Sequence, residues 1–64
     1  MNINSDKLRD LMILKGMNIG ELAYKSGVTR QTISNLLNNR TKSCNFKTLN
    51  NIASSLEVSY KNII

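Results

Sequence analysis

The chain has 64 residues and a formal net charge of +5, with one cysteine and neither histidine nor proline. A chain of this length is expected to form one domain over residues 1–64, near the lower size limit for a fold held by a hydrophobic core alone. A single cysteine excludes an internal disulfide, and the lack of histidine excludes a zinc site of the usual kind, so we expect no metal ion and no cofactor. No apolar run approaches the roughly 20 residues of a membrane span, and no signal sequence opens the chain, which favours a cytoplasmic protein without membrane contact.

The positive charge is unevenly distributed. Residues 1–28 hold four basic and three acidic side chains, whereas residues 29–64 hold five basic side chains and Glu57 as the only acidic one. One interpretation is a solvated basic surface that only aids solubility. The other is contact with the phosphates of a nucleic acid, which we favour because the basic region begins where a polar helix is predicted.

Caps and glycines mark the first two helices. The first is predicted from Asp6 to about Lys15, with Ser5 as its N-cap. The second follows Asn18, which can cap it, and stops at Gly27. Because glycine takes the left-handed conformation without steric cost, Gly27 can turn the chain sharply towards a further helix.

The third helix is predicted to begin after a Thr29 cap and to end near Asn38, which completes a helix-turn-helix over residues 18–38. The apolar side chains of this helix recur on one face: Ile33, Leu36 and Leu37. Its polar side chains share the opposite face: Arg30, Gln31, Ser34, Asn35 and Asn38. We therefore expect one face to pack against the core and the other to meet a partner.

The rest of the chain is predicted to close the fold. Segment 39–45 is polar, lacks apolar periodicity and is interpreted as a loop. A fourth helix is predicted from near Phe46 with Asn45 as its cap, and a last helical turn, Tyr60 to Ile63, follows a Ser59 cap. The expected architecture is all-α, with five short helices around one core made of Leu8, Leu11, Met12, Met17, Leu22, Ala23, Val28, Ile33, Leu36, Leu37, Phe46, Leu49, Ile52, Ala53, Leu56, Val58 and Ile63.

An ordered set of small, apolar and turn residues extends over nearly the whole chain: Leu8, Leu22, Ala23, Gly27, Val28, Ile33, Ser34, Leu49, Ala53, Leu56 and Val58. In this set the chain resembles the phage repressor and Cro type of helix-turn-helix protein, often called the XRE family. The resemblance implies a lambda-repressor-like DNA-binding domain in which the second and third helices form the helix-turn-helix. It also implies that the third helix, about 29–38, lies in the major groove of DNA.

The contacts with DNA are expected to divide into two classes. The third helix would contact base edges, because arginine matches the acceptors of guanine and glutamine matches adenine. We assign base contacts to Arg30, Gln31, Thr32, Ser34 and Asn35. The resemblance supports the assignment at Arg30, Gln31 and Asn35, where the family carries base contacts. Phosphates would meet the start of the second helix and the loop after the third, where contacts position the protein without specifying sequence. This second class comprises Asn18, Ile19, Asn38, Asn39, Arg40, Thr41 and Lys42.

Three departures from the family pattern are informative. Relatives commonly have glutamine at the position of Ile19, so here the phosphate contact would depend on backbone N–H groups. Many relatives hold an arginine and a glutamate at the positions of Met12 and Leu37, and we interpret this pair as an apolar contact that replaces an ion pair. Asn39 stands in place of a glycine and can still adopt the left-handed conformation, and Cys44, in place of a proline, is expected to be half-buried.

The expected function is a sequence-specific transcriptional regulator, a Cro-like repressor that binds a palindromic double-stranded DNA operator as a homodimer, with no small-molecule ligand. The dimer surface could involve Tyr60, Ile63 and Ile64, or Ile63 could close the core instead. An alternative is an antitoxin-type module that binds a partner protein with the same domain. An enzyme is disfavoured, because histidine and paired carboxylates are lacking.

Overall fold

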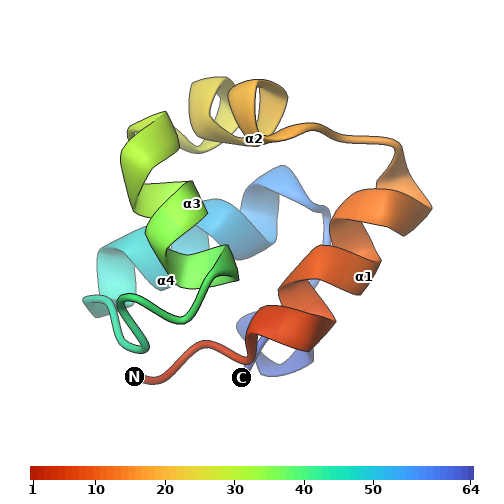
Figure 1. Ribbon diagram of the computed structural model, residues 1–64. Helices are drawn as coiled ribbons and strands as arrows, with labels where there is room; N and C mark the ends of the chain where they lie inside the picture. The colour runs from red at the N-terminus through yellow and green to blue at the C-terminus, as the bar shows by residue number, and fades with distance from the viewer.

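The computed structural model describes all 64 residues and contains four α-helices and one short 3-10 helix. The helices are α1 (Ser5–Lys15), α2 (Ile19–Ser26), α3 (Arg30–Leu37) and α4 (Phe46–Ser55), and the 3-10 helix is η1 (Tyr60–Asn62) (Figure 1). The prediction of an all-helical fold is confirmed, although the fifth element is a single 3-10 turn and not an α-helix. No helix is both long and apolar enough to cross a lipid bilayer.

Every helix starts at a residue whose side chain accepts a backbone N–H of the first turn, which satisfies a donor that has no partner within the helix. The predicted caps Asn18, Thr29, Asn45 and Ser59 are confirmed. The prediction of Ser5 was wrong: Asn4 caps α1, its Oδ1 accepting the N–H of Lys7 at 3.1 Å.

The shift of the first cap has a physical reason. With Asn4 as the cap, Ile3 lies just before the helix and Leu8 lies four positions inside it, the arrangement of a hydrophobic staple. Both side chains are buried in the core. Ile3 was not predicted to be a core residue, because it stands alone among polar residues.

The turns follow the predicted chemistry at Gly27 and Asn39, which have φ angles of 71° and 58°, and Gly16, directly after α1, has a φ of 67°. The sequence did not predict a fourth left-handed residue, Glu57, with a φ of 58°. Its N–H donates to Ser54 at 3.0 Å, and the next N–H, of Val58, reaches back to the carbonyl oxygen of Ala53 at 3.0 Å. These two bonds form a Schellman motif that closes α4.

The core differs from the predicted set at its edge. Phe46 was predicted to be inside but is 56% exposed, and its ring contacts Tyr60 with the centroids 5.9 Å apart. Phe46 is the first residue of α4, and its ring lies against Tyr60 of η1 and not inside the core. Four further predicted members are only partly buried and pack against the core from outside: Leu11, Met17, Val28 and Val58.

The helices surround the core in an arrangement that exposes one side of α3. α2 packs on both α3 and α4, α1 packs on α3, and η1 packs on α4. Figure 1 shows α3 in front, α4 behind it, and both ends of the chain on the side opposite to α2. The ends are joined there by a 2.8 Å hydrogen bond from the N–H of Asn4 to the carbonyl oxygen of Ile63. Ile63 is fully buried, so it closes the core.

Candidate nucleic-acid interface

The helix-turn-helix is formed by α2, the turn at Gly27 and α3. Ala23, on the inner face of α2, is buried, and its small side chain allows close approach of the neighbouring helices. Ile33, Leu36 and Leu37 of α3 are buried as predicted. The opposite side of α3 therefore faces solvent and is held rigidly by the packing of the buried side.

A pair of polar side chains one turn apart dominates the exposed side of α3. Nε2 of Gln31 donates a 2.9 Å hydrogen bond to Oδ1 of Asn35. Gln31 is exposed and Asn35 is half-buried. The bond holds the glutamine in one direction while its amide oxygen and second N–H hydrogen stay free, which leaves the donor and acceptor that recognition of adenine requires.

The other two short side chains predicted to meet bases have partners within the helix. The hydroxyl groups of Thr32 and Thr29 lie 2.9 Å apart, so Thr32 takes part in the cap of α3. The hydroxyl of Ser34 accepts from Nδ2 of Asn38 at 3.3 Å, and the same nitrogen donates to the carbonyl oxygen of Ser34 at 2.9 Å. Asn38, predicted to contact phosphate, therefore already uses its amide group to close α3.

Arg30 lies differently from its neighbours. A Cβ atom added to Gly20 would come within 3.3 Å of both Nε and Nη2 of Arg30, so the guanidinium lies across the first turn of α2. The chain has one ion pair, between Arg9 and Asp6 at 3.9 Å, and it does not involve Arg30. The sequence placed Arg30 correctly at the start of α3 but did not show that its side chain turns towards α2.

The start of α2 and the loop after α3 hold the residues predicted to contact phosphates. Oδ1 of Asn18 accepts the N–H of Glu21 at 2.8 Å, which leaves the amide nitrogen of Asn18 free to donate. In the loop, Asn39, Arg40, Thr41 and Lys42 are all exposed. The N–H groups of Arg40 and Thr41 both donate to the carbonyl oxygen of Asn35, at 2.9 and 3.2 Å. These bonds hold the start of the loop against the last turn of α3.

One contributor to this region escaped the sequence analysis. The N–H of Ile3 donates to the carbonyl oxygen of Lys42 at 2.7 Å, and the N–H of Cys44 donates to that of Met1 at 3.1 Å. The first residues therefore run beside the loop. A signal for this was present, because Ile3 and Leu8 have the spacing of a hydrophobic staple, which implies that the chain before α1 is ordered.

Cys44 is half-buried at the end of the loop, as predicted. Burial raises the pKa of its thiol above the ordinary value, and the positive charge of the amino group of Met1 opposes this in part. A raised pKa keeps the thiol protonated near neutral pH, where it is a poor nucleophile. Cys44 thus acts here as a small packing residue.

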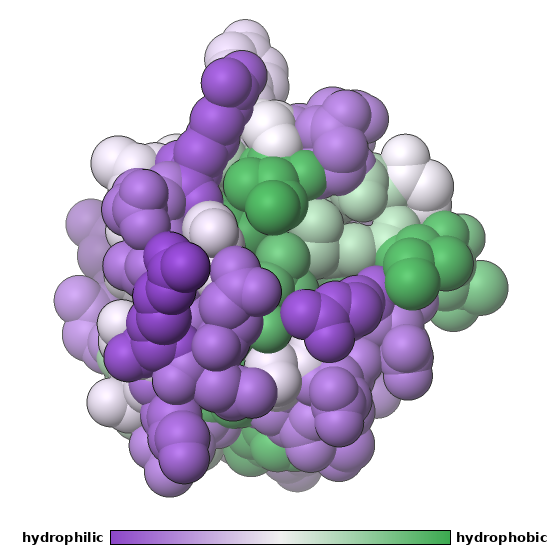
Figure 2. Space-filling view, in the orientation of Figure 1, coloured by the Kyte–Doolittle hydropathy of each residue, from purple (hydrophilic) through white to green (hydrophobic).

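Beside this region lies an open, largely apolar hollow of about 570 Å³, between α1, the start of α2 and the end of α3. Met12 and Leu37, 6% and 8% exposed, line it together with Ile19. Arg9 and Arg30 also line the hollow. Figure 2 shows apolar residues in the middle of this face and at its right edge, with hydrophilic residues to the left and below. The two residues that replace the ion pair of many relatives therefore lie in the same apolar environment.

Comparisons with known proteins agree on the fold and the family. A family model for the Cro/C1-type helix-turn-helix DNA-binding domain matches residues 7–64. The wild-type restriction-modification controller protein C.Esp1396I is 36% identical, with a TM-score of 0.77 over 86% of this chain and 70% of that one. A comparison with curated proteins gave no match.

Two more distant structures share the fold. The restriction-modification controller protein C.AhdI from Aeromonas hydrophila is 21% identical, with a TM-score of 0.84 over 91% of this chain and 86% of that one. SinR, the master regulator for biofilm formation, was solved in complex with DNA and is 24% identical, with a TM-score of 0.86 over 91% and 95% of the two chains. The chain belongs to the family of Cro/C1-type helix-turn-helix DNA-binding domains, and its function is that of a sequence-specific DNA-binding transcription regulator.

Proposed function

We propose that this chain is a Cro-like repressor that inserts α3 into the major groove of an operator. The observation that carries the proposal is the division of α3 into two sides. Ile33 and Leu36 anchor one side in the core, and the hydrogen-bonded pair Gln31 and Asn35 occupies the other. A rigid helix that presents amide groups in a fixed direction suits the donor and acceptor pattern of the major groove.

Within this proposal, base contacts come from Arg30, Gln31, Thr32, Ser34 and Asn35. Gln31 is the strongest candidate, since it is exposed and held in place by Asn35. Arg30 can reach a guanine only after its guanidinium leaves Gly20. The hydroxyl of Ser34 accepts from Asn38 and can still donate, whereas the hydroxyl of Thr32 shares a hydrogen bond with that of Thr29.

Phosphate contacts in this proposal flank the groove on both sides. On one side are Asn18 and the backbone at Ile19, in the first turn of α2. On the other side the exposed loop supplies Asn39, Arg40, Thr41 and Lys42, with Asn38 at its start. No carboxylate lies in the sequence between Glu21 and Glu57, so nothing in this segment repels a phosphate.

A palindromic operator bound by a homodimer is part of the proposal. One domain of this size buries little surface on DNA, and two half-sites about 34 Å apart would double the contact. Because Ile63 is buried, the side chains left for the dimer contact at this end are Phe46, Tyr60 and Ile64. The proposal also places the protein in the cytoplasm. It includes no cofactor, metal ion, small-molecule ligand or catalytic activity.

A protein-binding role of the antitoxin type is the second candidate. It is supported by two large apolar side chains on α1, Ile13 and Leu14, which are 72% and 76% exposed. Exposed apolar side chains in adjacent positions mark surfaces that bind other proteins. This role is compatible with DNA binding, because α3 and α1 expose different residues.

The test is selection from a random double-stranded DNA library at two salt concentrations, followed by sequencing. The wild type is expected to enrich a palindrome, and Gln31→Ala is expected to lose about 1–3 kcal/mol at that site and to accept other bases at one position of each half-site. Lys47→Ala serves as the control, because Lys47 is exposed on α4 and its truncation leaves α3 intact. The control is expected to select the same sequence as the wild type. If no sequence is enriched, or if Gln31→Ala prefers the same sequence as the wild type, the proposal is wrong.

A further inference from the structure

In the loop that follows α3, the residues before Cys44 place no side chain in the core. All residues from Asn38 to Ser43 are exposed. Side-chain packing therefore does not determine the shape of this segment, which depends on hydrogen bonds of the backbone. At its start these bonds go to Asn35, as described above, and at its end they go to the first residues of the chain.

The bonds at the end of the loop resemble a short antiparallel ribbon. Asn2 and Ser43 form an isolated antiparallel bridge. On either side of it, the N–H of Ile3 donates to the carbonyl oxygen of Lys42 at 2.7 Å and the N–H of Cys44 donates to that of Met1 at 3.1 Å. Figure 1 shows the first residues running beside this loop, on the same side of the molecule.

The segment before α1, which forms one side of this ribbon, is anchored in the core. The side chain of Ile3 is 7% exposed and belongs to the core. The next residue, Asn4, caps α1 and donates its N–H to Ile63. The first four residues, Met1–Asn4, are thus fixed at their inner end and reach the loop with their outer end, and we name them the N-terminal strap.

We propose that the N-terminal strap is a positioning element for DNA binding, which holds Arg40 and Lys42 in the arrangement that meets the phosphates. Ordering a loop reduces its conformational entropy, and a loop ordered before binding does not lose that entropy on the DNA. Ile3 acts here through Lys42 and touches no DNA itself. The inference rests on the proposed phosphate contact of this loop.

A double-mutant cycle tests the coupling between Ile3 and Lys42. In the wild type, Lys42→Ala is expected to lower the slope of log affinity against log salt by about 1. In an Ile3→Ala background the same change is expected to lower the slope by less than half as much, because the loop no longer holds the lysine at the phosphate. An equal reduction in both backgrounds would overturn the proposal.

A matched control separates positioning from loss of stability. Ile52 in α4 is fully buried, so Ile52→Ala removes the same atoms from the core without touching the strap. We expect Ile52→Ala to leave the effect of Lys42→Ala on the slope at its wild-type value. Should Ile3→Ala fail to fold, Ile3→Val takes its place, with a smaller loss of coupling in the same direction.

Amide hydrogen exchange of the wild type supplies a second measurement. The amides of Ile3 and Cys44 are expected to be protected, in contrast to the exposed amide of Ser43, and exchange at unprotected rates would overturn the proposal. A wild-type slope that Lys42→Ala does not change would also overturn it. The groove-reading role of α3 is tested separately by Gln31→Ala, so the two failures are distinguishable.

Discussion

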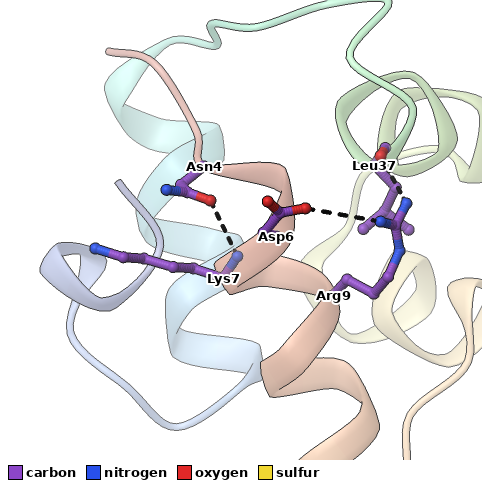
Figure 3. A network of polar contacts seen from close by, with 5 residues as sticks. All are labelled: Asn4, Asp6, Lys7, Arg9 and Leu37. Atoms are coloured by element: carbon purple, nitrogen blue, oxygen red, sulfur yellow. Dashed lines mark hydrogen bonds and ion pairs between the residues drawn. The ribbon is translucent and has the colours of Figure 1, made fainter.

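Nη2 of Arg9 in α1 donates a 2.9 Å hydrogen bond to the carbonyl oxygen of Leu37, the last residue of α3 (Figure 3). This carbonyl lies in the last turn of a helix, where main-chain acceptors lack partners within the helix and the helix dipole favours a positive charge. The same guanidinium lies 3.9 Å from Asp6 on its exposed side. An arginine of α1 thus contacts the end of α3 by a charged hydrogen bond to the backbone.

Removing this contact should destabilise the fold. Arg9→Ala is expected to reduce the free energy of unfolding by about 1 kcal/mol, the lower part of the range for a charged hydrogen bond, because the side chain is half exposed. Urea denaturation of both proteins measures the difference. Asp6→Ala is the control and should cost less, about 0.5 kcal/mol, because the exposed ion pair is weak and Asp6 otherwise contributes only through its charge in the first turn of α1. Equal losses in the two variants would show that the bond to Leu37 contributes nothing of its own.

Met12 and Leu37 should be coupled if they replace an ion pair by an apolar contact. Met12→Arg is expected to cost on the order of 3 kcal/mol, because it places an unpaired charge in a buried position. Adding Leu37→Glu should recover part of that loss by supplying a partner. Thermal and denaturant unfolding of the two single variants and the double variant measure the coupling. A double variant that shows only the sum of the single effects would mean that the two positions do not interact.

Glu57 should be replaceable with a gain in stability. It holds the left-handed conformation that glycine adopts without strain, so Glu57→Gly is expected to stabilise the fold by about 0.5–1 kcal/mol. Asn39→Gly is the matched change at the other non-glycine residue with positive φ, and its gain should be smaller because asparagine tolerates this conformation. Chemical denaturation gives both values. A loss at position 57 would indicate that the glutamate side chain makes a contact that outweighs the strain.

Arg30 can be assigned to a base or to the DNA backbone by one comparison. If its guanidinium leaves Gly20 to reach a guanine, Arg30→Ala should relax the preference at that base pair, and Arg30→Lys should not restore it, because lysine cannot form the paired contact as well. We expect this result in the library selection. A uniform loss of affinity for all sequences on Arg30→Ala would instead assign Arg30 to a phosphate.

Features that depend on neighbours within a few residues could be predicted before the structure was known. The caps Asn18, Thr29 and Asn45 and the turn at Gly27 could be predicted because their hydrogen bonds and φ angles are local. The two-sided nature of α3 follows from helical periodicity, and the helix-turn-helix was predicted from the caps and the Gly27 turn together with the resemblance to a known family.

Contacts between distant parts of the chain could not be predicted in this way and became visible in the folded structure. Arg9 contacts Leu37, which is 28 residues away in the sequence, and the N–H of Ile3 donates to the carbonyl oxygen of Lys42 in the loop after α3. Phe46 has the apolar spacing of a core residue but is mostly exposed, because at the first position of α4 its ring lies against Tyr60 of η1 and not inside the core. Such contacts depend on how the packed helices bring remote residues together, and periodicity and capping chemistry carry no information about that arrangement.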